Sequence, residues 1–190
     1  MGGTVGAWGD ESMRVTNVSE PMYLLGVALA DEPTAERARE AMHSIHKAGP
    51  KLHWRDLEPK AKARSVETVG SLGLDHLVVV AAPLDPRRQE RARAKCLERL
   101  CWEVQDLGGS RVVLESRTES LNQRDRNLIP KLRGQNALPM GLRVDWQLGS
   151  EEPMLWIADQ VLGAYGDAQT GETQYLSIIE QDIAVCPIKL

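Results

Sequence analysis

The residue with the clearest chemical significance is an aspartate inside an otherwise apolar helical segment. Residues 153–165 read Pro-Met-Leu-Trp-Ile-Ala-Asp-Gln-Val-Leu-Gly-Ala-Tyr, with Asp159 near the centre. Its neighbours on a helix surface, three and four positions away, are Leu155, Trp156, Leu162 and Gly163. A carboxylate among buried residues is costly unless it is paired, hydrogen-bonded or bound to a metal. The pattern predicts either an aspartate satisfied by an arginine or by backbone N–H groups, or a metal ligand.

Two further acidic residues follow predicted strands. Asp10 comes after the apolar run 5–8, and Glu115 comes directly after the run 111–114. Alone, Asp10 is typical of a turn and Glu115 of a cap on the next segment. With Asp159 they make a set of oxygen ligands that suits Mg²⁺ or Mn²⁺. Two such ions, roughly 4 Å apart, would activate a water and stabilise the leaving oxygen in phosphodiester hydrolysis.

A few other polar residues fit the same chemistry. His53 could place a proton and Arg55 could hold a phosphate, although 53–55 could equally be a surface loop anchored by its tryptophan. Arg117 and Arg124, with Arg126, could contact a phosphate backbone or could simply solvate a helix face. Asp145 is a further candidate carboxylate that strand alternation could also turn toward water.

Composition excludes several classes of protein. The chain has 190 residues, 42% of them hydrophobic, and a net charge of -4, so it is no basic coat for nucleic acid. Its three cysteines, Cys96, Cys101 and Cys186, lack CxxC spacing and are expected to be ordinary thiols in a reducing cytoplasm. The apolar runs are too short to span a membrane. No phosphate-binding glycine loop, GxSxG or HExxH motif is found.

The periodicity of the chain predicts an α/β fold. Strands are expected at 5–8, 22–30, 76–82, 111–114 and 142–146, and helices at 33–48, 59–72, 86–107, 121–132 and 152–165. The tail at 173–185 could form a strand pair. The early strands suit antiparallel pairing and the later strand–helix–strand units suit parallel crossovers, which gives a mixed sheet with helices on its faces. The apolar strands and the tryptophans would permit a homodimer.

Four separated segments resemble the bacterial family called domain of unknown function 3800. They are Asp10-Glu11-Ser12, Leu52-His53-Trp54-Arg55-Asp56-Leu57, Glu115-Ser116-Arg117 with Asp125 downstream, and Ile157-Ala158-Asp159-Gln160-Val161-Leu162-Gly163-Ala164. The chain departs from the family pattern in two places. Met13 stands where the family commonly has Gly, and Trp156-Ile157 stand where it usually has Leu-Gln.

The family looks like a member of the ribonuclease H-like superfamily, and this resemblance implies the rest of the expectation. It implies one ribonuclease H-like domain over 1–190 with a five-stranded mixed sheet, a helical insertion at about 33–72 and a C-terminal extension at about 166–190. It also implies that Asp10, Glu115 and Asp159 hold divalent metal, and that a fourth carboxylate comes from the first long helix, as Glu98 or Glu103.

The leading hypothesis is a nuclease or related phosphoryl-transfer enzyme that depends on Mg²⁺ or Mn²⁺ and acts on nucleic acid. Asp10, Glu115 and Asp159 would bind the metal, His53 would assist proton transfer, and Arg55, Arg117 and Arg124 would hold the substrate. The alternative is a non-catalytic module that binds nucleic acid or protein on the same scaffold. A third hypothesis is a structural subunit in which Asp159 pairs with a buried arginine.

Overall fold

A six-stranded mixed sheet forms the centre of the computed structural model, which describes residues 4–190. The strands are β1 (Val5–Arg14), β2 (Met22–Ala30), β3 (Asp75–Ala82), β4 (Gly109–Glu115), β5 (Arg143–Gln147) and β6 (Ile183–Lys189). Their order across the sheet is β5-β4-β1-β2-β3-β6. Antiparallel pairs join β1 to β2 and β2 to β3, whereas β1–β4, β4–β5 and β3–β6 are parallel. The predicted mixed sheet is confirmed; the first three residues of the predicted domain lie outside the described part.

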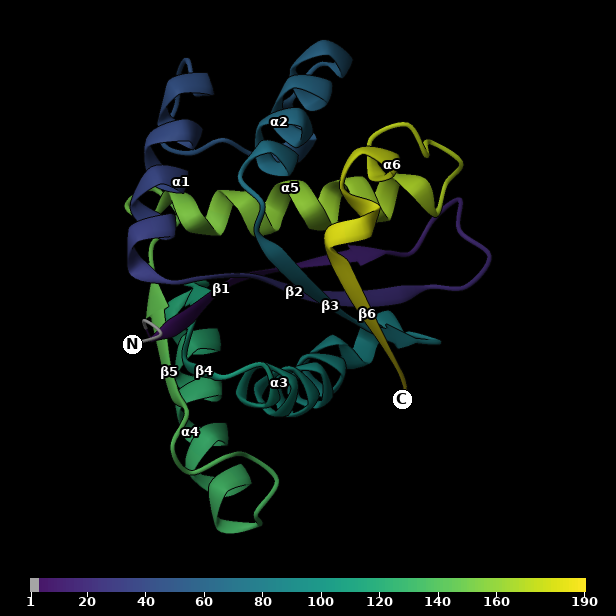
Figure 1. Ribbon diagram of the computed structural model, residues 1–190. Helices are drawn as coiled ribbons and strands as arrows, with labels where there is room; N and C mark the ends of the chain where they lie inside the picture. Colours follow the sequence, from purple (N-terminus) through teal and green to yellow (C-terminus); the bar gives the residue numbers. More distant parts are fainter. Residues whose placement is uncertain (1–3) are drawn as a thin grey trace.

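Helices cover both faces of the sheet. They are α1 (Glu32–Ile45), α2 (Pro59–Ser71), α3 (Gln89–Asp106), α4 (Glu119–Gly134), α5 (Pro153–Ala168) and the short α6 (Leu176–Ile179), with single 3-10 turns at Trp54–Asp56, Pro86–Arg88 and Glu180–Asp182. In Figure 1, α5 lies along one face beneath α1, α2 and α6, and α3 and α4 lie on the opposite face. None of the helices described is long and apolar enough to cross a membrane.

Two elements differ from the sequence prediction. The first strand does not stop at residue 8 but continues to Arg14, because Gly9 to Arg14 pair with residues 22–27 of β2. Asp10 therefore lies inside a strand, opposite Gly26, and is not a turn residue. The tail forms one strand, β6, parallel to β3, and not a strand pair. This sixth strand covers the backbone edge of the apolar β3, which would otherwise be open to pairing with another chain.

Strand alternation divides the core into two layers. Trp8 and Val113 pack with α5 on one face, whereas Ala7 and Val112 pack with α3 on the other. The α5 helix is buried over nearly its whole length, because the sheet covers one side and α1, α2 and the 52–57 segment cover the other. This explains why its sequence is apolar around its full circumference.

The α5 helix approaches the 52–57 segment closely at Gly163. A Cβ built on Gly163 would lie 2.1 Å from Cγ of Trp54, whose indole is buried against the helix. The indole N–H of Trp54 donates a hydrogen bond to Asp167 at 2.9 Å. Gly163 thus sets the position of Trp54, and with it the position of the neighbouring His53.

We expect Gly163→Ala to destabilise the protein by about 1–3 kcal/mol, the usual cost of overpacking a core. Helix propensity alone predicts the opposite sign, because Ala is favoured over Gly in a helix interior by about 0.5–1 kcal/mol. Urea unfolding measures the difference. Gly134→Ala in α4 is the matched control, because a Cβ there meets no atom within 4 Å. A Gly163→Ala protein as stable as this control would contradict the packing described.

Candidate metal centre

Asp10 and Glu115 project from the same face of neighbouring strands. Gly9 is paired with Leu114 across the parallel β1–β4 ladder, so the next residues, Asp10 and Glu115, lie side by side. Trp8 and Val113, two residues earlier on each strand, pack on the α5 side of the sheet. Because side chains alternate along a strand, Asp10 and Glu115 face α5 as well.

Asp159 completes the set from α5. Its Oδ2 atom accepts a hydrogen bond from the backbone N–H of Trp54 at 2.9 Å and lies 2.7 Å from Nδ1 of His53. An ionised carboxylate can only accept, so the proton of this second bond belongs to Nδ1. Asp159 is therefore satisfied by a backbone amide and a histidine and not by the arginine that one hypothesis required.

The third carboxylate, Glu115, is paired with a lysine. Nζ of Lys51 lies 2.6 Å from Oε1 of Glu115, and both side chains are about one-fifth exposed. The loop before α5 closes over the same carboxylate at Gly149, where a Cβ would lie 2.7 Å from Oε1. A side chain at position 149 would force the Glu115 carboxylate to shift, so this loop and the carboxylate are positioned together.

Mutual repulsion links the three acids. The pKa of Asp10 is raised well above its usual range, first by burial of its carboxylate and then by the negative charges of Glu115 and Asp159. Lys51 and the hydrogen bond from the backbone N–H of Glu11 act in the opposite direction. The pKa of Lys51 is itself raised, because its hydrogen bond with Glu115 and the charge of Asp10 outweigh the opposing effect of burial.

The donor set suits a hard divalent cation. Within residues 4–190, one oxygen of each carboxylate makes no hydrogen bond: Oδ2 of Asp10, Oδ1 of Asp159 and the buried Oε2 of Glu115. Carboxylate oxygens are the ligands that Mg²⁺ and Mn²⁺ prefer. Across the same residues, no three His, Cys, Asp or Glu side chains are close enough together to form a ready-made metal site. The three side chains are of the right chemical type to bind a divalent cation. In this structure, the ammonium of Lys51 supplies the positive charge beside Glu115.

The structure brings His53 to this site but leaves the proposed arginines outside it. The Arg55 side chain is 77% exposed, and among residues 4–190 its one ion-pair partner is Asp56, at 3.7 Å. Arg124 is exposed on α4, on the far side of the sheet. Substrate binding by either residue stays a prediction.

Arg117 belongs to a separate ionic network on the α3 face. It pairs with Glu90 at 2.7 Å and with Asp125 at 3.1 Å. The buried Arg93 pairs with the same Asp125 at 2.7 Å and with Glu11, the residue after Asp10. These ion pairs occupy Arg117, so they oppose its predicted contact with substrate.

The other candidate carboxylates also lie elsewhere. Glu98 and Glu103 sit on α3, across the sheet from Asp159, and pair with Lys95 and Arg99. Neither is the fourth carboxylate that the first long helix was expected to supply. Asp145 accepts hydrogen bonds from Arg111 and Arg143, which explains this strand carboxylate as part of a surface ion-pair cluster.

Sequence reasoning missed two residues of the site. Lys51 lies two positions before His53, and in extended chain such a spacing places both side chains on one side. That alternation was a usable signal. Gly149 carried no signal of its own, because only the folded loop shows that Glu115 fills the space a Cβ would need.

Solved structures show where this fold occurs. The chain is similar to ribonuclease HII from Archaeoglobus fulgidus, solved in complex with PCNA, at 12% identity over 93% of this chain and 77% of that chain, with a TM-score of 0.53. It is also similar to Bst-RNase HIII in complex with Mn²⁺, at 12% identity over 92% of this chain and 53% of that chain, with a TM-score of 0.48. A third similar structure is ribonuclease H2 from Pyrococcus horikoshii OT3, at 14% identity over 92% of this chain and 76% of that chain, with a TM-score of 0.43. The chain spans about half the length of Bst-RNase HIII.

The likeness to ribonuclease HII establishes the fold class alone. The protein has a ribonuclease H-like fold, as expected, with six strands in place of the five predicted. No protein-family model matches the sequence. No curated protein matches it either.

The raised pKa of Asp10 predicts that its charge destabilises the metal-free protein. An unfolded-state aspartate titrates near pH 3.9, so the native protein carries this cost at pH values above the raised folded-state pKa. The cost disappears as the pH falls through that pKa toward about 4. Asp10→Asn should therefore raise Tm in EDTA at pH 7, and the gain should vanish near pH 4. Thermal melts at the two pH values measure this.

Asp145→Asn is the control for this experiment. It also removes one carboxylate from the α5-facing side of the sheet, but that carboxylate is paired with Arg111 and Arg143. We expect its Tm at pH 7 to stay unchanged or to fall. An Asp10→Asn protein that melts below the wild type at pH 7 without metal would contradict the electrostatic strain.

Proposed function

We propose that the protein is a nuclease that hydrolyses phosphodiester bonds with the help of Mg²⁺ or Mn²⁺. One observation carries the proposal: Asp10, Glu115 and Asp159, from β1, β4 and α5, lie near one another between the sheet and α5, and within residues 4–190 each keeps a carboxylate oxygen that accepts no hydrogen bond. Few reasons other than cation binding favour holding three like charges together in a partly buried place. The scaffold that carries them is shared with ribonuclease HII.

The carboxylates of Asp10, Glu115 and Asp159 would hold the metal. When bound, a divalent ion supplies positive charge to the leaving oxygen and lowers the pKa of a water. The protein's own contribution is the placement of His53. Asp159 fixes Nδ1 of this ring, so Nε2 is the nitrogen left to exchange a proton with substrate or water.

Lys51 would change partners when the metal binds. Its ammonium is paired with Glu115 at 2.6 Å, and a divalent ion at that carboxylate would repel it. The released lysine would then be available to a phosphate of the substrate. Arg55 and Arg124, both exposed, remain candidates for further phosphate contacts.

A binding module without metal is the second candidate function. The specific observation in its favour is that Lys51 already neutralises Glu115, while the described residues form no ready-made group of three ligands. In that case the acidic cluster and its lysine would be a settled ion-pair site, and the partner would be nucleic acid or protein.

The chain is also proposed as a member of the family called domain of unknown function 3800. The support is the four sequence segments, each of which supplies residues to the site. These residues are Asp10, His53 with Trp54, Glu115 and Asp159. A ribonuclease H-like fold is what that membership implies.

Metal binding tests the proposal directly. Saturating Mn²⁺ at about 100 times its Kd would stabilise the native state by about 2.7 kcal/mol, which corresponds to a Tm rise of several degrees for a chain of this size. We expect this rise in the wild type and in the Asp145→Asn control, and its loss in Asp159→Asn. Metal-dependent cleavage of RNA, DNA or hybrid substrates should likewise be present in the wild type and in Asp145→Asn and absent in Asp159→Asn. Metal-dependent cleavage by Asp159→Asn at the wild-type rate would refute the proposed site.

Lys51→Met separates the two candidate functions. Without metal the substitution leaves Glu115 unpaired, and we expect a loss of about 1–3 kcal/mol, because the pair is partly screened by solvent. For a nuclease, Mn²⁺ should restore most of this stability and bind more tightly than to the wild type, since the competing ammonium is gone. A variant that is destabilised but indifferent to Mn²⁺ in urea unfolding would favour the binding module.

A further inference from the structure

A pocket of about 520 Å³ opens beside the carboxylate site. Its walls are the end of α1 with the segment that follows it, residues 45–53, and the first half of α2 with the turn before it, residues 56–65. Lys51 and His53 connect the pocket to the carboxylate site. Both line the pocket, and Lys51 contacts Glu115 whereas His53 contacts Asp159. A molecule in the pocket would therefore reach the proposed reaction centre through these two side chains.

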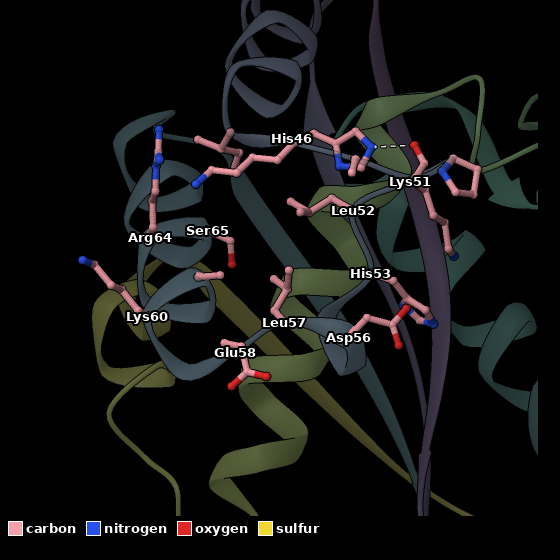
Figure 2. A pocket seen from close by; sticks show the side chains of 16 residues that line it. His46, Lys51, Leu52, His53, Asp56, Leu57, Glu58, Lys60, Arg64 and Ser65 are labelled. Carbon is pink, nitrogen blue, oxygen red and sulfur yellow. Dashed lines mark hydrogen bonds between the residues drawn. The ribbon is translucent and has the colours of Figure 1, made fainter.

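The pocket combines an apolar wall with a cationic rim. Leu52 and Leu57 lie between the two sides in Figure 2, and Ile45 and Ala61 add further apolar surface. Three cations also line it, and within residues 4–190 none of them forms an ion pair: Lys47, Lys60 and Arg64. Figure 2 shows Lys60 and Arg64 across the pocket from Lys51 and His53. Of the residues described, only two acidic ones, Asp56 and Glu58, line the pocket, so its lining carries more positive than negative side chains.

This combination matches a nucleotide unit of a nucleic acid. A base needs an apolar surface of pocket size, and the phosphates on either side of it need cations at the rim. A volume of about 520 Å³ lies within the usual range for small-molecule pockets. A base inside a duplex is stacked and cannot enter such a pocket, whereas a base in a single strand can.

We propose that this pocket binds one unpaired nucleotide next to the scissile phosphate, which makes a single strand the substrate class. The inference rests on the proposed nuclease function, because it takes the carboxylate site as the place where the strand is cut. The base lies against Leu52 and Leu57, and the flanking phosphates lie near Lys60 and Arg64. The strand then passes Lys51 and His53 into the site.

The test is binding of a short fluorescein-labelled oligothymidylate, measured by anisotropy in EDTA so that no cleavage occurs. The double variant Lys60→Ala/Arg64→Ala should raise Kd roughly tenfold or more at low salt. The slope of log K against log salt should become shallower by about 1.4, since each phosphate neutralised on a single strand contributes about 0.7. The control Arg37→Ala/Lys131→Ala removes the same charge from exposed positions outside the pocket and should bind like the wild type.

A second variant tests the apolar part of the pocket without changing its charge. Ala61 is exposed on α2 and lines the pocket, so Ala61→Trp should fill it and weaken binding by about the same factor, while the melting temperature stays near that of the wild type. Unlabelled single strand should compete at least tenfold better than a duplex of the same sequence. Equal competition by the duplex, or equal weakening by the control, overturns the inference.

Different experimental results would refute this inference and the proposed function. If Asp159→Asn abolishes cleavage but Lys60→Ala/Arg64→Ala leaves both binding and cleavage unchanged, the nuclease stands and the pocket is not its nucleotide site. If the pocket variants weaken single-strand binding but no metal supports cleavage by the wild type, the pocket binds a strand and the nuclease proposal fails. The pocket would then belong to a binding module, and its link to catalysis is refuted.

Discussion

The carboxylate of Asp159 joins the buried helix α5 to the segment that carries the rest of the site. Its Oδ2 atom accepts hydrogen bonds from the backbone N–H of Trp54 and from His53. Moving a carboxylate from water into the protein interior costs several kcal/mol of free energy unless such hydrogen-bond partners are present. Because the indole of Trp54 also packs on Gly163 of the same helix, the segment is fixed at two successive turns of α5. The placement of Lys51, His53 and one wall of the pocket depends on this contact.

Charge balance is the second constraint. Three carboxylates from three elements lie near one another, and burial together with repulsion by Glu115 and Asp159 raises the pKa of Asp10. Lys51 offsets part of that repulsion through Glu115. In the structure the lysine supplies the positive charge that offsets these carboxylates. In the proposed function a divalent cation would take over that role, and Lys51 would leave Glu115.

The sheet separates this site from a second set of charges. Asp10 faces α5, and the adjacent Glu11 faces α3, where it pairs with the buried Arg93. Asp125 and Arg117 extend that network on the same face. Its members pair with one another almost completely, so the network fixes the ends of β1 and β4 against α3 and α4. The site on the other face depends on those strand ends staying in place.

The sequence by itself determined the kinds of elements, the mixed sheet and the three acids. Hydrophobic periodicity depends on local geometry, and an aspartate in an apolar helix is conspicuous without knowledge of the fold. The sequence did not show that Asp10 lies inside β1, because that follows from pairing with β2. It assigned Arg117 to substrate, whereas the fold pairs it with Glu90 and Asp125. The pairing of Lys51 with Glu115 was decided by the fold, because the two residues are 64 positions apart in the chain. Long-range pairing and the face toward which a charge points were decided by the tertiary structure, since a charged side chain is satisfied by whichever partner the packing brings near.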